Sequence, residues 1–401
     1  MESAAMDAWR EIHEEAAAAD AADPLGHLRE RMALPEGVAY LDGNSLGPLT
    51  HAAREAVRRC VEEEWGTGLI GSWSEGAWVD LAARTAGRIA GLIGAPAGSV
   101  ACADSTTVNL HKALHAAVSL APGRRRIVSV RGDFPTDRYV TARVAADRGL
   151  SVRQVDAAEL PDALDEDVAV VTMSHVDFRS ARIADLPGIT AAAHAVGALA
   201  VWDLAHSAGA LPVDIAASGA DLAVGCGYKY LNGGPGAPAF LYVAPRHAEA
   251  QNPIPGWFGH ADPFAFGEAY VPAPGARRFE AGTTPVLGMT ALNAALTAFD
   301  GVAVAHLRRR GIELTQRLVA LFDAHLAPLG VTLQTPRDPG VRGGHVMLGH
   351  PRAQELVRTL AAGGVVGDFR PPDGLRFGFA PLYTTRTEVV RLVRELAALL
   401  A

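Results

Sequence analysis

Short apolar runs alternate with amphipathic stretches from about residue 98 to residue 243. Runs of this length are typical of buried strands, and most of the stretches between them have helical spacing. The pattern predicts an α/β fold in which helices cover a mostly parallel, seven-stranded sheet. The expected strands are SVACA, RIVSV, SVRQV, VAVVTM, ALAVW, DLAVG and AFLYV.

The pattern changes on both sides of this block. An extended segment is expected at residues 40–42, and Thr50 can cap a helix from residue 51 to about residue 65. A Pro/Gly-rich stretch at residues 253–275 interrupts the alternation, and a long helical region follows from about Leu287. The alternation then returns as VTLQ, HVML, VVGDF and LRFGF with two helices, which predicts a smaller C-terminal α/β domain.

Composition narrows the class of protein. The chain has 401 residues, of which 49% are hydrophobic and 20% are charged, as in ordinary globular proteins. Its formal net charge of -8 argues against a nucleic-acid partner. The N-terminus is acidic and lacks the apolar stretch of a signal peptide, and no later run is long enough to span a membrane. We therefore expect a soluble protein without a membrane partner.

The spacing of cysteines and histidines indicates whether the chain binds a metal and whether it folds in a reducing cell compartment. Cys60, Cys102 and Cys226 form no CxxC pair and are odd in number, so neither a disulfide framework nor a thiolate zinc site is indicated. His111 and His115 stand four residues apart, a spacing that can hold a metal, but no third ligand is placed nearby in the sequence. We expect no metal and a cytoplasmic location.

Asp203 and Lys229 are the most informative pair in the chain. Asp203 follows the apolar run ALAVW, and Lys229 follows DLAVG, so both lie at strand ends, where ligands bind in open α/β sheets. A lysine amine can bind the aldehyde of pyridoxal phosphate covalently, and a buried carboxylate can keep the pyridine nitrogen protonated. The alternative is a surface lysine before a flexible loop. His206, three residues after Asp203, can support the same site or be a hydrogen-bonded core histidine.

Two further segments can complete a cofactor site. Thr106 and Thr107 begin a predicted helix after a strand, where hydroxyl and free N–H groups can bind a phosphate, although a plain helix cap explains them as well. Phe134 could lie against the cofactor ring and Asp137 near its ring oxygen. A helix that starts at Pro135 is the alternative for this segment.

Loop and strand residues later in the chain can also contact a ligand. Trp257 and Thr283 lie in loops without apolar periodicity, where aromatic and hydroxyl groups often bind ligands. Arg376 alternates with apolar residues on a predicted strand and could clamp a substrate carboxylate through two hydrogen bonds. A salt bridge from Arg376 to Asp368 or Asp373 is the competing explanation.

Taken together, seven segments resemble kynureninase, a family in the class V aminotransferase group of fold-type I pyridoxal phosphate enzymes. The acid, the histidine three positions later and the lysine mark only the wider group, whereas YLDGNSLG, FPTD and GWFGH are specific to the family. The similarity spans nearly the whole chain. The segments are YLDGNSLGPL (40–49), TTVNLH (106–111), DFPTD (133–137), DLAHSAGALPVD (203–214), YKYLNGGPG (228–236), GWFGH (256–260) and RFGFAPLY (376–383).

The resemblance implies a homodimeric enzyme that hydrolyses L-kynurenine, or also its 3-hydroxy form, to anthranilate and L-alanine in tryptophan catabolism. The site would lie at the subunit boundary. The implied fold is that of fold-type I pyridoxal phosphate enzymes, with an N-terminal segment (1–50) packed on the small domain, a large cofactor-binding domain (51–295) and a small C-terminal domain (296–401).

The resemblance also implies a role for individual residues. Lys229 would bind the cofactor, Asp203 would face its pyridinium, and Tyr228 would contact the cofactor and is a candidate proton relay. The other implied cofactor contacts are Thr106, Thr107, Phe134, Asp137, Ser174, His206, Trp257 and Thr283. Arg376 would hold the substrate carboxylate, and the substrate pocket would include Trp65, Gly282 and Asn44. Trp65, Gly282 and Thr283 stand where animal enzymes carry histidine, serine and asparagine, which resembles the bacterial, kynurenine-preferring type.

Other classes of protein remain as alternatives. An aminotransferase or a cysteine desulfurase would share the fold, but desulfurases use a cysteine well after the lysine, and no cysteine follows Cys226. A non-catalytic cofactor-binding protein has no need to retain the lysine, the acid and the arginine together. A dinucleotide enzyme is disfavoured because no GxGxxG follows a predicted strand.

Overall fold

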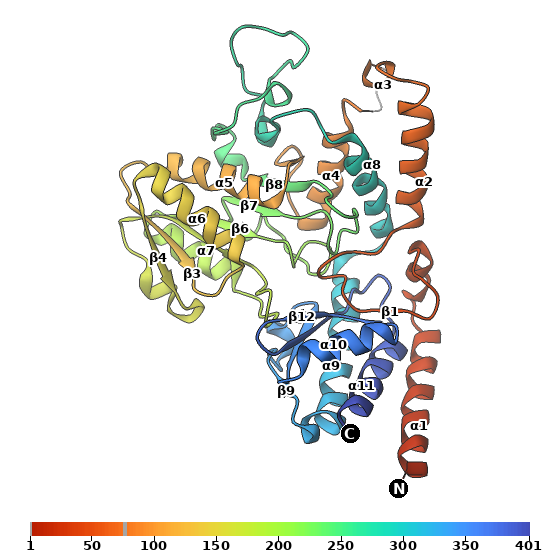
Figure 1. The fold of residues 1–401 in the computed structure, drawn as a ribbon. Helices are drawn as coiled ribbons and strands as arrows, with labels where there is room; N and C mark the ends of the chain where they lie inside the picture. Colours follow the sequence, from red (N-terminus) through yellow and green to blue (C-terminus); the bar gives the residue numbers. More distant parts are fainter. Residues whose placement is uncertain (1, 75–77) are drawn as a thin grey trace.

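All seven apolar runs between residues 98 and 243 form strands of one sheet in the computed structural model, which describes residues 2–74 and 78–401 (Figure 1). The strand order is β2-β8-β7-β6-β5-β3-β4. Strands β7, β6, β5, β3 and β4 pair in parallel, whereas β8 runs antiparallel to both neighbours. The bounds are β2 (Val100–Ala103), β3 (Arg126–Val130), β4 (Ser151–Val155), β5 (Val168–Ser174), β6 (Leu199–Asp203), β7 (Leu222–Gly225) and β8 (Ala239–Val243).

Apolar side chains on both faces of this sheet explain why its strands are continuous apolar runs. Along β6, Ala200 and Trp202 pack in one hydrophobic cluster, and Val201 packs in the other, because successive strand residues point to opposite faces. One face is covered by α4 (Leu81–Ile93), α7 (Leu186–Ala195) and α8 (Val286–Ala295), and the other by α5 (Thr106–Leu120) and α6 (Pro135–Arg148).

The C-terminal part has its own core, as the second region of alternation predicts. Its antiparallel sheet has the order β12-β13-β10-β9 and packs against the apolar faces of helices α9, α10 and α11 (Figure 1). The bounds are β9 (Thr332–Leu333), β10 (His345–Gly349), β11 (Val365–Val366), β12 (Asp368–Arg370), β13 (Gly374–Gly378), α9 (Val304–His325), α10 (Ala353–Ala362) and α11 (Arg386–Leu400).

The N-terminal segment lies against this C-terminal part. Strand β1 (Ala39–Tyr40) pairs in parallel with β11, and α1 (Glu2–Ala21) runs beside α11 (Figure 1). Arg386, at the start of α11, binds Asp20 and Asp23 at the end of the N-terminal helical region. These contacts agree with the expected packing, and the domain boundaries at residues 50 and 295 stay predictions.

The segments between the two sheets are helical or irregular. Thr50 caps α2 (His51–Arg59) by accepting a hydrogen bond from the Ala53 amide at 3.0 Å, as its position predicts, and a wider helical turn continues to Trp65 before α3 (Gly71–Ser74). The Pro/Gly-rich stretch forms a long loop between β8 and α8 that projects from the body (Figure 1). No single helix in the described ranges is long and apolar enough to cross a membrane. The segments Val286–Phe299 and Val304–His325 together have the length and composition of a membrane span, but an 80° bend separates them.

Candidate active site

Asp203 and Lys229 come together at the carboxyl edge of the large sheet. Asp203 is the last residue of β6 and is only 8% exposed, and Lys229 lies half-buried in the loop after β7. The lysine lowers the pKa of Asp203, although burial dominates and leaves that pKa raised. The Lys229 Nζ lies 3.4 Å from Nε2 of the buried His206. The pair is therefore a single site, and His206 belongs to it.

Two further carboxyl groups lie beside this pair. Asp133 and Asp137 come from the start of α6 and its preceding loop, and both are buried beside Asp203. Burial and the neighbouring carboxylates raise the pKa of Asp137 well above its ordinary value, and its hydrogen bond to Asp203 favours the protonated form of Asp137. Asp137 thus serves as a neutral donor to the Asp203 carboxylate.

Asp133 holds the end of the neighbouring strand. It accepts hydrogen bonds from the Ser174 amide at 2.9 Å, the Ser174 hydroxyl at 2.6 Å and the Phe134 amide at 2.8 Å. Ser174 is the last residue of β5 and pairs with Asp203 across the parallel ladder. The sequence places Asp133 at a strand end but assigns it no role. Its burial and its partners become visible only in the fold.

A cationic ring beside Phe134 would suit the acidic cluster. Lys229 Nζ lies 5.9 Å from the centroid of the Phe134 ring, which is 37% exposed and so presents an open face. The edge of Phe134 is held by Phe178 in a perpendicular contact, with 5.3 Å between ring centroids. A buried carboxylate is costly without a cation, and a pyridinium between Phe134 and Asp203 would provide one. The residues present therefore fit the ring of pyridoxal phosphate.

A phosphate would fit at the start of α5. The helix cap is Ser105, whose hydroxyl accepts from the Val108 amide at 3.4 Å, so Thr106 and Thr107 are the first helical residues rather than the cap. The Thr106 Oγ1 is buried and has no hydrogen-bond partner within the described chain. An unpaired hydroxyl beside the free N–H groups of a helix terminus is suited to an anion. A plain helix cap is therefore present, but Ser105 provides it, and Thr106 and Thr107 stay predicted phosphate contacts.

Tyr228 lies next to the lysine, as the sequence requires, and faces it. Its ring centroid is 5.9 Å from Lys229 Nζ. Burial raises the pKa of Tyr228 to about 12, with a further contribution from Cys226 and Asp203. The hydroxyl therefore keeps its proton near neutral pH.

Arg376 has the partner that the competing interpretation named. Its Nε and Nη2 bind both oxygens of Asp368, at 2.9 and 2.5 Å, while Ser45 Oγ and the Phe178 carbonyl accept further hydrogen bonds. Asp373 is not involved; it accepts from Gln334. Arg376 is only 1% exposed, and these contacts leave one N–H of Nη1 for another ligand. A two-pronged contact between Arg376 and a substrate carboxylate is therefore not available in this arrangement.

Asn44 is completely buried beside the C-terminal sheet. Both polar atoms of its side chain lack hydrogen-bond partners among the described residues. A Cβ at Gly378 would lie 1.8 Å from Asn44 Oδ1, so only glycine leaves room for the amide. A buried amide without partners is expected to bind something that the chain itself does not supply.

The remaining expected residues lie on the surface of this single chain. Trp65 is 56% exposed, Trp257 is 37% exposed, and Gly282 and Thr283 are also exposed. Trp257 packs against aromatic neighbours of its own loop, with ring centroids 4.3 Å apart for Phe258. Among the described residues, none of these four forms a hydrogen bond or ion pair with Lys229. Their assignment to the site stays a prediction.

His345 is a site residue that the sequence analysis missed. It is fully buried on β10, and its ring centroid lies 5.4 Å from that of His206. The only signal is a histidine inside an apolar strand, GGHVML, which is equally typical of a core histidine. Its nearness to the lysine depends on how the two sheets are placed, which no sequence pattern encodes.

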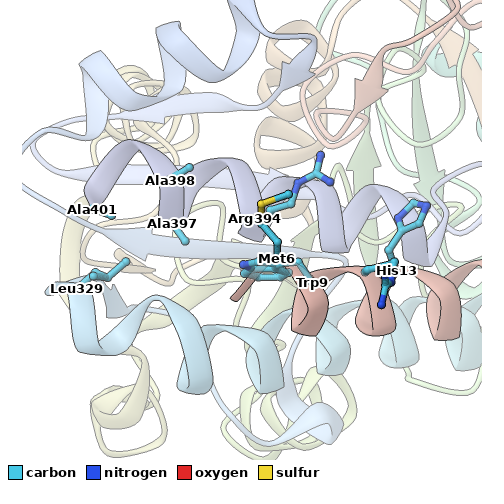
Figure 2. A pocket seen from close by; sticks show the side chains of 9 residues that line it. Met6, Trp9, His13, Leu329, Arg394, Ala397, Ala398 and Ala401 are labelled. Carbon is cyan, nitrogen blue, oxygen red and sulfur yellow. The ribbon is translucent and has the colours of Figure 1, made fainter. Parts of the chain in front are cut away.

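Other histidines and cavities lie away from this site. The rings of His111 and His115 contact each other at 4.4 Å, and no cluster of three or more metal-ligating side chains occurs in residues 2–74 and 78–401. A cavity of about 640 Å³ lies between α1 and the end of α11, where Trp9, Met6 and Arg394 line it (Figure 2). None of the expected site residues lines this cavity.

Comparison with known proteins identifies the relatives of this chain. The kynureninase C-terminal domain matches residues 307–396. Kynureninase of Deinococcus radiodurans is 48% identical over 390 residues, covering 96% of this chain and 95% of the relative. Kynureninase of Pseudomonas fluorescens is 45% identical, covering 96% of this chain and 94% of the relative.

Solved structures share the fold at low identity. A C-DES mutant with glycine covalently linked to its PLP cofactor superimposes with a TM-score of 0.80 at 19% identity, covering 92% of this chain and 98% of that one. Cysteine desulfurase of Thermococcus onnurineus, an apo structure, also gives 0.80 at 19% identity, with coverages of 93% and 97%. These similarities confirm the predicted fold class and carry no information on substrate.

Proposed function

The chain belongs to the kynureninase family, and we propose that it uses pyridoxal phosphate bound at Lys229 to hydrolyse L-kynurenine to anthranilate and L-alanine. Relatives named kynureninase that are 45–48% identical over 96% of the chain support the reaction. The aminotransferase and desulfurase alternatives are not favoured, because the desulfurase likeness extends only to the fold.

One observation carries the assignment of the site. Asp203 is buried with two further carboxyl groups, Asp133 and Asp137, and the Lys229 Nζ lies 5.9 Å from the centroid of the Phe134 ring. Burying carboxylates without a cation is costly, and a pyridinium beside Asp203 would offset that cost. Lys229 lies beside the same acids and would supply the amine for covalent attachment.

When bound, pyridoxal phosphate provides an electron sink for a negative charge at the Cα of an amino acid. Lys229 would hold the cofactor, and its Nζ would take the α-proton of the substrate. Asp203 would keep the ring nitrogen protonated, with its carboxyl group oriented by the hydrogen bond to Asp137. Tyr228, protonated near neutral pH, returns a proton to the β-carbon that becomes the alanine methyl group.

The other expected cofactor contacts surround this position. Thr106, Thr107 and the first N–H groups of α5 would bind the phosphate, since Thr106 Oγ1 is buried without a partner in the described chain. Ser174 and His206 would contact the ring substituents from strand ends β5 and β6. On the substrate side, Arg376 offers its remaining N–H to the carboxylate, and Asn44 offers its amide.

We further propose that the enzyme is a homodimer in which the partner completes each site. Trp257 and Thr283 are exposed in this chain and would reach the cofactor of the partner subunit, while Trp65 and Gly282 would line the substrate pocket at the boundary. Exposed aromatic side chains such as Trp257 and Trp65 are suited to an interface. A cytoplasmic location and a role in tryptophan catabolism complete the proposal.

A direct assay tests the reaction. Purified protein is supplied with pyridoxal phosphate and L-kynurenine, and anthranilate fluorescence and alanine release are followed together. Equal amounts of both products are expected. An oxo acid in place of alanine would indicate an aminotransferase and would reject the proposed hydrolysis.

A further inference from the structure

Three polar side chains share one face of the C-terminal sheet where it meets the lysine. In the antiparallel pair of β10 and β13, Met347 lies opposite Arg376 and His345 opposite Gly378. In an antiparallel pair, residues opposite each other point to the same face, and so do residues two positions apart on one strand. His345 and Arg376 therefore project on the same side of the sheet. Asn44 fills the space above Gly378 on that side, as the close approach of its Oδ1 shows.

His345 is buried without the hydrogen bonds that a core histidine normally makes. Its exposure is 0%, and neither ring nitrogen has a hydrogen-bond partner in the described ranges. The backbone of Arg179 approaches the ring without hydrogen-bonding geometry, so both ring nitrogens are unpaired in the described chain. Buried histidines of the same chain contrast with it: His175 Nδ1 lies 2.8 Å from Ser207 Oγ.

The charges around His345 suit an anion. Burial lowers the pKa of His345 well below its ordinary value, and the positive charges of Arg376 and Lys229 lower it further. The ring is therefore neutral and can donate from one nitrogen without adding a buried charge. The Asp368 carboxylate raises the pKa of His345, but both of its oxygens are already bound to Arg376.

Arg376 alone cannot donate hydrogen bonds to both oxygens of a carboxylate. One N–H of Nη1 is left after Asp368, Ser45 and Phe178 have taken the others, and a carboxylate has two oxygens that need donors. Unpaired polar groups on the same face include those of His345 and Asn44.

We propose that His345 completes the binding site for the α-carboxylate of the substrate, by donating a ring N–H to the oxygen that Arg376 does not reach. The inference rests on the proposed function, since it names a further residue of that site. The ligand is any α-amino acid whose amine reaches the cofactor at Lys229, and its carboxylate then lies between β10, β13 and Asn44.

Binding of two small ligands to the holoenzyme isolates the carboxylate. L-Alanine, which is also the product, carries the carboxylate, and L-alaninamide carries a neutral amide in its place. Dissociation constants are obtained from the change in visible absorbance of the bound cofactor. The variants are His345→Leu, which removes both nitrogens, and His345→Gln, which keeps an N–H donor. His350→Leu, just beyond the other end of β10, is the matched control.

In His345→Leu, the affinity for L-alanine is expected to fall by roughly 10- to 100-fold, the effect of losing a buried hydrogen bond to a charged group. The affinity for L-alaninamide should change by less than about twofold, and His345→Gln should recover most of the loss. Equal losses for both ligands, or none, would overturn the inference and return His345 to a packing role.

The test also separates this inference from the proposed reaction. A wild-type protein that binds L-alanine through His345 but releases no anthranilate from L-kynurenine would contradict the function and leave the carboxylate site intact. A wild-type protein that hydrolyses L-kynurenine while His345→Leu binds both ligands normally would contradict only the inference. Should the leucine variant fail to fold, the glutamine variant is expected to bind L-alanine more tightly than L-alaninamide, like the wild type, and equal affinity for the two ligands would overturn the inference.

Discussion

Asp133 accepts two hydrogen bonds from Ser174, one from its amide at 2.9 Å and one from its hydroxyl at 2.6 Å. This contact ties the start of α6 to the end of β5, next to Asp203 across the ladder. It therefore sets the position of Phe134 and Asp137 relative to the lysine.

Replacing Asp133 by Asn should loosen this connection, because the amide NH₂ would face N–H and O–H donors. We expect the free energy of unfolding to fall by about 1 to 2 kcal/mol and the cofactor affinity to fall about tenfold. Urea titration and cofactor titration measure the two effects. Asp165→Asn, at an exposed pair with Arg126, is the control and should change stability by less than about 0.5 kcal/mol. An Asp133→Asn variant that matches this control would show that the contact is dispensable.

Lys229→Ala should remove covalent attachment and abolish hydrolysis while the fold stays intact. The protein is expected to keep its circular dichroism spectrum but to lose the bound cofactor on gel filtration. Borohydride reduction followed by peptide mass analysis should label Lys229 in the wild type. Labelling of another lysine, or activity in the alanine variant, would contradict the assignment of the site.

Asp221 is predicted to control acid stability. It is completely buried and binds His247, His194 and Arg246, and together with the Ala200 amide these hydrogen bonds lower its pKa to about 2 despite burial. Because the folded pKa lies below the ordinary 3.8, the stabilisation is present above about pH 4 and is lost as the pH falls toward 2. At neutral pH it amounts to roughly 2 kcal/mol.

Asp221→Asn should therefore unfold more easily at pH 7 by at least about 2 kcal/mol, and the difference from wild type should shrink at lower pH. Denaturant titrations at pH 7, 5 and 3 test the trend. A difference that grows as the pH falls would show that Asp221 stabilises the fold by some means other than its charge.

Mixed dimers test whether the site is shared. Lys229→Ala and Trp257→Ala should each be nearly inactive, and a mixture allowed to exchange subunits should recover up to roughly a quarter of wild-type activity, because each mixed dimer holds one intact site. Thr107→Ala mixed with Lys229→Ala is the control: both residues would act within one chain, so their mixed dimers hold no intact site. No recovery in the test pair would place Trp257 in the site of its own chain, and recovery in the control pair would place Thr107 in the site of the partner subunit.

The sequence pattern predicted those structural elements that depend on interactions between residues close together in the chain. Continuous apolar runs predicted all seven strands of the large sheet, and the Thr50 hydroxyl predicted its helix start, because burial on two faces and capping depend on neighbouring residues. The strand-end rule also placed Asp203 and Lys229 at one edge.

The sequence by itself thus determined the fold class, the family and the pair Asp203 and Lys229, since these follow from local patterning and from motifs whose residues lie close along the chain. Only the tertiary structure decided that Asp368 binds Arg376 from a neighbouring strand and that His345 lies unpaired beside His206. The choice of Asp368 over Asp373 depends on the register of β12 against β13, which the sequence leaves open. The approach of His345 to His206 depends on the packing of the C-terminal sheet against the loop after β6, and residues separated by more than a hundred positions carry no local signal of such a contact.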